Sequence, residues 1–333
     1  MPRTGFAFPT GTAAAHIVET AKAAEAHGFE SFWLTEGGGK DSISQLAFVA
    51  AHTHRIKLGT GIVTIFSRTP VMLAQTAVGM SELSGGRFVL GLGAGHEASV
   101  QRSQGQRFTR PATRMEDYIR IIKTLLREGR TSYQGQEVSV EEFRLFGAQT
   151  PVEAPVYVAT LGGPLARVAG ALADGVLPLM ASPQGIQRLR EHIEEGARAA
   201  GRDPASVDIA CFIIACASSD SAAAEAEARR QVARYGSLPF YQRMLRLSGF
   251  EAEVDRFVDA QASGDQARLP DLVTDRMLEA LTLTGPASRW RETIDRFRAA
   301  GVTLPIVYAA PVGPDGNASL LQAARTLTPD DLA

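Results

Sequence analysis

The fold is decided by the stretch Lys57-Leu58-Gly59-Thr60-Gly61-Ile62-Val63, a mostly apolar run that ends among glycines. A helix is predicted next, over Val71–Leu83, and a second apolar run, Arg87–Leu92, follows that helix closely. Neither run alternates between polar and apolar residues. Continuous apolar runs are typical of parallel strands that helices cover. The stretch therefore predicts a strand, a helix and a second strand of one parallel sheet.

The same rhythm continues on both sides of this unit. Eight strands separated by helices, with no long linker rich in Pro, Ser or Gly, favour one closed barrel over two doubly wound halves. We therefore predict the α/β class, with a single (β/α)8 TIM-barrel domain over residues 1–333. The further predicted strands are Gly5–Pro9, Ser31–Leu34, Val156–Ala159, Val176–Leu179, Val207–Cys216 and Pro305–Tyr308. The further predicted helices are Ala13–His27, Ser42–Thr53, Arg114–Arg127, Leu165–Ala173, Gln184–Ala200 and Arg289–Ala300.

Two insertions interrupt the rhythm. Residues 133–147 alternate like a β-hairpin, and residues 220–283 hold several polar segments that favour helices. Active sites of such barrels are built from the loops that follow the strands. The helical insertion is therefore either a lid or pocket wall, or a segment that packs on the outside or against a partner subunit.

Composition excludes several classes of protein. The chain has 34 Lys and Arg against 36 Asp and Glu, so a net charge of −2 offers no basic surface for nucleic acid. Its apolar runs are far shorter than the roughly 20 residues that span a bilayer, and the N-terminal sequence lacks the pattern of a secretory signal. Cys211 and Cys216 match no metal spacing and are predicted to be packing residues. We expect a cytoplasmic protein without a metal, a nucleic-acid partner or membrane contact.

Glycine gathers where four consecutive predicted strands end. Bare backbone lets a flat ligand approach closely, and free N–H groups ahead of a helix favour anions. The pattern predicts a phosphate-bearing cofactor across the end of the barrel, although each loop taken alone is equally typical of a tight turn. The glycines are Gly37–Gly39, Gly59, Gly61, Gly91, Gly93, Gly95, Gly162 and Gly163.

Several segments resemble one known family. From about residue 5 to residue 310 the chain is similar to the bacterial luciferase-like monooxygenase superfamily. Lys40-Asp41 and the segment from Gly249-Phe250 onwards look most like its F420-dependent methylenetetrahydromethanopterin reductase branch. The segments that carry the resemblance are Ala23–Leu34, Ile56–Ile62, Arg68–Pro70, Ser84–Gly93, Leu172–Val176 and Ala200–Pro204.

The resemblance implies a homodimeric barrel that binds a flavin or deazaflavin at the carboxyl ends of its strands. It implies a non-proline cis peptide bond between Gly61 and Ile62, against which the cofactor ring rests, and phosphate contacts in the loops of the next two strands. The cofactor-binding residues implied in this way are Glu36, Thr60, Gly61, Ile62, Gly93, Ala94, Gly95, His96, Ala159, Thr160, Leu161, Gly162 and Gly163.

Glu36 and His96 are the predicted catalytic residues. Glu36 closes a strand, where a carboxylate can bind a ring N–H or tune proton transfer; alternatively it is a solvated loop acid or a partner of Lys40. Imidazole titrates near neutral pH, so His96 is predicted to donate to a phosphate or protonate a substrate; alternatively it is a loop histidine in water before a helix. Arg68 is predicted either to pair with Glu36 or to contact an anionic substrate group. Many flavin-using members of the superfamily carry His where this chain has Gly37.

The function predicted is hydride transfer between coenzyme F420 and a small organic or pterin-like substrate. An FMN-dependent two-component monooxygenase that uses reduced flavin and oxygen is the first alternative. A non-catalytic flavin-binding protein is the second. A deazaflavin with a long anionic tail needs extra basic residues at the rim, for which Arg102, Arg107 and Arg110 are candidates.

Overall fold

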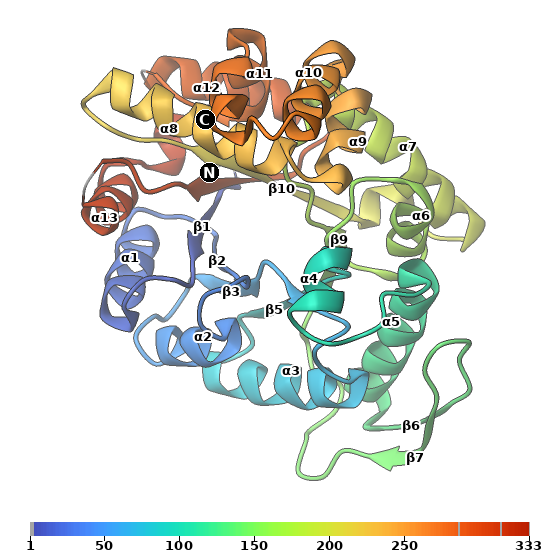
Figure 1. Cartoon of the computed structure of the whole chain (residues 1–333). Coiled ribbons are helices and arrows are strands. Elements are labelled where there is room, and N and C mark those ends of the chain that lie inside the picture. Colours follow the sequence, from blue (N-terminus) through green and yellow to red (C-terminus); the bar gives the residue numbers. More distant parts are fainter. Residues whose placement is uncertain (1–2, 286, 314, 333) are drawn as a thin grey trace.

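In the computed structural model, which describes residues 3–285, 287–313 and 315–332, eight parallel strands close into a barrel (Figure 1). The order around the barrel follows the chain, and the last strand pairs with the first. The predicted (β/α)8 barrel is confirmed. The barrel strands are β1 (Gly5–Pro9), β2 (Ser31–Thr35), β3 (Lys57–Thr60), β5 (Phe88–Gly93), β8 (Val156–Val158), β9 (Gly175–Val176), β10 (Asp208–Ala215) and β12 (Leu304–Ala309).

Helices surround the strands, and the short α4 lies inside their ring in Figure 1. The predicted domain 1–333 includes residues 1, 2, 286, 314 and 333, which lie outside the described residues. The helices are α1 (Ala14–Ala26), α2 (Ser42–Ala50), α3 (Pro70–Ser84), α4 (Glu97–Arg102), α5 (Pro111–Glu128), α6 (Gly163–Leu172), α7 (Pro183–Ala199), α8 (Ser221–Gly236), α9 (Pro239–Leu247), α10 (Glu251–Ala262), α11 (Asp275–Leu281), α12 (Ala287–Ala299) and α13 (Gly316–Thr326). The 3-10 helices are η1 (Pro204–Ser206), η2 (Gln266–Leu272) and η3 (Pro329–Leu332).

Side chains from alternate strand positions fill the inside of the barrel. Trp33, Tyr157 and Phe212 form its aromatic centre, with the Trp33 ring 5.8 Å from that of Tyr157 and 6.0 Å from that of Phe212. A Cβ at Gly59 would lie 2.2 Å from the Trp33 indole, so glycine at this position lets the indole fit inside. The barrel is therefore a packed core and not a pore.

The strand predicted over Lys57–Val63 is two strands. β3 ends at Thr60, the cis peptide bond Gly61–Ile62 that the resemblance implied follows it, and the two-residue β4 (Val63–Thr64) then pairs with β5. The predicted strand Val176–Leu179 is also shorter than expected, because Pro178 has no N–H to continue the ladder.

The two predicted insertions have different surroundings. β6 (Arg130–Tyr133) and β7 (Val140–Arg144) pair antiparallel and project beyond α5 in Figure 1. Helices α8 to α11 follow β10, and the two-residue β11 (Thr282–Leu283) pairs parallel with the end of β10. The helical insertion thus leaves the barrel from the carboxyl end of a strand.

Candidate functional site

Segments at the carboxyl ends of four neighbouring strands form one end of the barrel, which we call the mouth: residues 36–41, 61–64, 93–96 and 159–163. A Cβ at Gly93 would lie 2.6 Å from the Ile62 side chain and 3.5 Å from the Cβ of Ala159. The structure thus brings predicted site residues from three of these segments together. Ile62, Ala94 and Ala159 are half-buried there, so part of each side chain remains accessible to a ligand.

Gly61 lies where the mouth meets the barrel core. A Cβ at this position would lie 2.6 Å from Cζ of Phe212, which fills the barrel interior. Packing against a phenyl ring, and not only the approach of a ligand, therefore accounts for the missing side chain at Gly61. The sequence could not show this because Phe212 is distant in the chain.

The hydroxyl groups of two predicted site threonines bind neighbouring backbone. Thr60 Oγ1 donates to the carbonyl of Gly91 at 2.9 Å and accepts from the N–H of the same residue at 2.8 Å. Thr160 Oγ1 accepts from the N–H of Gly162 at 3.2 Å. Both threonines are buried, so these side chains fix the loops, and the loop backbone is what the mouth presents.

The segment before α6 presents bare backbone at the mouth. Gly162 and Gly163 have φ of 123° and 64°, in the range that favours glycine, and α6 begins at Gly163, next to the buried Leu161. A Cβ at Gly163 would lie 3.7 Å from Arg243 Nη2 on α9. The helix start and the guanidinium group together make this part of the mouth favourable for an anion.

His96 precedes α4, and α9 covers it. Its ring centroid lies 5.5 Å from that of Tyr241 and 6.1 Å from that of Phe240. Burial lowers the pKa of His96 below its ordinary value. The imidazole is therefore neutral at neutral pH, and one ring nitrogen donates a hydrogen bond while the other accepts one.

Glu36 is held by donors from two elements. Arg68 Nη1 donates to its Oε1 at 2.7 Å, and the hydroxyl of Ser42 donates to its Oε2 at 2.7 Å. Lys40 instead donates to the carbonyl of Thr12 at 2.8 Å. Of the predicted alternatives, the pair of Glu36 with Arg68 is the one found.

Asp41 extends this ion pair into the start of α2. Its carboxylate accepts the N–H of Ser44 at 2.6 Å, which caps the helix, and it also pairs with Arg68. Burial lowers the pKa of Arg68, but the hydrogen bonds and charges of Glu36 and Asp41 outweigh burial and raise it. The ion pairs therefore hold residues 36–41 to the segment just before α3.

Sequence reasoning missed the residues that α9 brings to the mouth. Phe240, Tyr241 and Arg243 lie in a segment recognisable only as a helix-forming piece, far along the chain from His96 and Gly163. The aromatic pair after Pro239 was the available signal. Of the predicted rim residues, Arg110 is bound to Glu137 and Gln136, whereas Arg102 and Arg107 are exposed.

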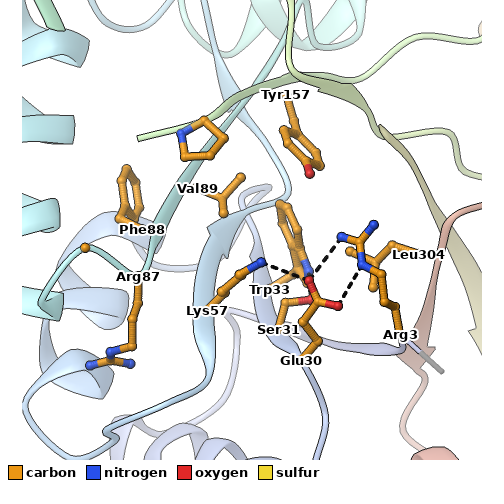
Figure 2. Close-up of a pocket in the computed structure, with 12 residues that line it drawn as sticks. Arg3, Glu30, Ser31, Trp33, Lys57, Arg87, Phe88, Val89, Tyr157 and Leu304 are labelled. Atoms are coloured by element: carbon orange, nitrogen blue, oxygen red, sulfur yellow. Dashed lines mark hydrogen bonds and ion pairs between the residues drawn. The ribbon is translucent and has the colours of Figure 1, made fainter. Parts of the chain in front are cut away.

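A small cavity of about 70 Å³ lies at the opposite end of the barrel, where the strands begin. Figure 2 shows Arg3 and Lys57 pointing toward Glu30 beneath Trp33. Arg3 also pairs with Asp208 at 2.8 Å, and the hydroxyl of Tyr157 donates to Asp208 at 2.6 Å. These groups satisfy one another, which is typical of a structural cluster.

Within the described ranges no group of three or more His, Cys, Asp or Glu side chains is arranged to hold a metal ion. No helix among the described residues is long and apolar enough to cross a membrane.

A family model described as luciferase-like monooxygenase matches residues 3–304. The chain belongs to the luciferase-like monooxygenase family. A 5,10-methylenetetrahydromethanopterin reductase of Methanolobus tindarius is 31% identical over 306 residues, which cover 90% of this chain and 91% of the relative. The family resemblance seen in the sequence is thereby confirmed.

Solved structures of the family share the fold over nearly the whole chain. The F420-dependent tetrahydromethanopterin reductase of Methanopyrus kandleri superposes with a TM-score of 0.85 at 25% identity, covering 99% of both chains. The oxygenating component of 3,6-diketocamphane monooxygenase from Pseudomonas putida, solved with FMN, gives 0.66 at 18% identity, covering 99% of this chain and 98% of that one. The latter likeness concerns the fold alone.

Proposed function

We propose that this luciferase-like protein is an F420-dependent oxidoreductase that transfers hydride between the deazaflavin and a small organic or pterin-like substrate. The observation that carries the proposal is the 31% identity to a methylenetetrahydromethanopterin reductase along nine-tenths of both chains. The mouth also supports the proposal. Backbone at the ends of three strands lies beside the start of α6 and Arg243, an arrangement that suits a flat ligand with an anionic group.

The residues at the mouth fit a planar cofactor with an anionic tail. The ring would lie over Gly61 and Ile62, and the anionic part would lie near Gly162, Gly163 and Arg243. The exposed guanidinium of Arg243 has no ion-pair partner within the described part of the chain, so its charge is available. Coenzyme F420, when bound, supplies the hydride chemistry.

Glu36 and His96 would serve this reaction in different ways. The carboxylate of Glu36 already accepts from Arg68 and Ser42, which suits orienting the loop beside the proposed ring position. The neutral His96 ring carries a proton on one nitrogen and suits hydrogen bonding to a substrate. We propose Glu36 as a positioning residue and His96 as the group that contacts the substrate.

A homodimer and a cytoplasmic location are also proposed. Three large apolar side chains are exposed on the adjacent helices α2 and α3: Phe48 at 47%, Met72 at 52% and Leu83 at 63%. Met72 and Leu83 are eleven residues apart, so they share one side of α3. A second copy of the chain would cover this surface, and light scattering of the purified protein gives its mass in solution.

Titration of the purified protein with F420 and, separately, with FMN tests the cofactor. Quenching of the ligand's fluorescence reports binding, and we expect F420 to bind at least tenfold more tightly than FMN. Arg243→Met should weaken F420 binding by about tenfold, because one charge-assisted contact is lost. The reverse preference would support the monooxygenase alternative, and the absence of binding by both would support the non-catalytic one.

A further inference from the structure

A continuous series of aromatic side chains connects the barrel core with the surface of α9. Phe212 lies 6.0 Å from Tyr308, and Tyr235 lies 5.0 Å from Tyr241. Burial raises the pKa of Tyr235 well above its ordinary value, and the neighbouring Tyr308, to which it is hydrogen-bonded, raises it further. The series therefore runs from β10 and β12 through α8 into α9 at the mouth.

Phe240 ends this series and differs from the rest of it. Tyr241 is 8% exposed, whereas Phe240 is 48% exposed although its ring lies 5.5 Å from that of Tyr241. Burial of apolar surface is favourable, so this half-exposed ring leaves contact surface unused. Its edge-to-face contact with His96 places that surface at the mouth and not on the outside of the barrel.

The first turn and the middle of α9 meet different parts of the mouth. Phe240 adjoins His96 in the loop after β5, and Arg243 adjoins Gly163 in the loop after β8. Residues three apart lie on one face of a helix, so both side chains belong to the same face of α9. The Arg243 side chain lies beside the proposed anion position, which leaves the Phe240 side chain for the other reactant.

We propose that Phe240 is a substrate-binding residue, against which a planar heteroaromatic ring of the pterin class stacks. This inference rests on the proposed function and narrows its substrate to flat rings. A phenyl face stacks well on a flat ring, and the neutral His96 beside it offers one donor and one acceptor to the polar ring edge. A small aliphatic substrate would leave the Phe240 surface uncovered.

Binding of tetrahydromethanopterin and of tetrahydrofolate to the F420-loaded protein tests the inference. Both probes carry the planar pyrimidine ring of a pterin, which is the part that would stack on Phe240, and calorimetry gives their affinity. Phe240→Ala should weaken pterin binding about tenfold or more and change F420 affinity less than about twofold, since it removes the stacking face for the pterin only. Phe240→Trp should keep pterin affinity within about threefold of the wild type, because it keeps a stacking face.

Val258→Ala is the matched control. Val258 is an apolar side chain of α10 in the same insertion, exposed at 41%, and its loss should alter neither affinity. Unchanged pterin binding in Phe240→Ala, equal losses in the Ala and Trp variants, or no pterin binding by wild-type protein that binds F420 would each overturn the inference. Failure of the wild type to bind F420 would instead contradict the proposed function.

Discussion

Gly61 lies between the proposed cofactor position and the barrel core, and it has no room for a side chain. The Phe212 ring occupies the space that a side chain at Gly61 would need. The position is therefore sensitive to substitution before any ligand is considered. A loss of cofactor binding in a Gly61 variant is informative only when its stability is measured as well.

Gly61→Ala should lower the free energy of unfolding by about 1–3 kcal/mol, because the new methyl group collides with Phe212. Adding Phe212→Leu should restore part of the loss by making room. Urea unfolding followed by circular dichroism measures both effects. Gly37→Ala is the control: a Cβ there has no neighbour within 4 Å, so the change should stay within about 0.5 kcal/mol. Wild-type stability of Gly61→Ala would show that the Phe212 ring moves without cost.

At the scale of elements, one buried carboxylate attaches the β6–β7 hairpin to the barrel. Asp117 on α5 is 3% exposed and accepts the N–H groups of Glu137 and Val138 at 2.7 and 3.0 Å. It also accepts the hydroxyl of Tyr133 at 3.0 Å. Burial and this carboxylate raise the pKa of Tyr133 to about 12, so the tyrosine remains the donor.

Asp117→Ala should loosen the hairpin and leave the barrel folded, because its three donors lose a common acceptor. We expect faster hydrogen exchange in residues 130–144 and a cost of about 1–3 kcal/mol. Glu116→Ala removes only an exposed pair with Arg120 and serves as control. Uniformly faster exchange across α5 and β5 would contradict a local role for Asp117.

The other insertion has a different relation to the barrel. Helices α8 to α11 follow the carboxyl end of β10, and α9 contacts His96 in the mouth. An insertion at this end of a barrel strand is placed to add residues to a site, whereas the hairpin lies outside α5. The sequence predicts segment 220–283 to be either a lid or pocket wall, or a segment packed on the outside or against a partner subunit. The contact of α9 with His96 favours a pocket wall.

At the scale of the whole molecule, the two ends of the barrel differ in chemistry. Beside the ion pairs of Arg68 with Glu36 and Asp41, the mouth presents glycine backbone and half-buried apolar side chains. The opposite end holds Arg3, Glu30 and Lys57 (Figure 2), and Asp208 joins their ion cluster. Burial raises the pKa values of Glu30 and Asp208, but the hydrogen bonds of Arg3, together with those of Lys57 to Glu30 and of Thr303 and Tyr157 to Asp208, outweigh burial and lower both. This cluster ties the starts of β1, β2 and β10 together.

The lowered pKa values of Glu30 and Asp208 mean that the cluster stabilises the fold less as the pH falls. Their stabilisation is present above the pKa values of the unfolded chain, near 4.5 for Glu30 and 3.8 for Asp208, and is lost as the pH falls through the folded values. Arg3→Met should therefore be less stable than the wild type at about pH 7 and lose less stability down to about pH 3. Urea unfolding across this range measures both slopes.

Arg127→Met is the control for the pH experiment, because Arg127 pairs with Glu128 on the open surface. Its stability should follow the wild-type dependence on pH. Parallel curves for the wild type and Arg3→Met would show that the cluster does not contribute to acid sensitivity.

The sequence by itself determined the barrel and the places where its ligand loops begin. Apolar runs and helix periods are local properties, so eight strands could be counted, and the structure confirms this count. The family was recognisable for the same reason, since its motifs are contiguous segments. Short strands were less predictable, because Gly175–Val176 depends on its neighbours for pairing.

Only the tertiary structure decided which distant residues meet at the mouth. Phe212 against Gly61, Arg68 against Glu36 and α9 against His96 all join segments far apart in the chain. Such contacts depend on how the barrel closes and how the insertion packs. A local sequence pattern predicts neither the closure of the barrel nor the packing of the insertion, because both depend on contacts across the whole chain.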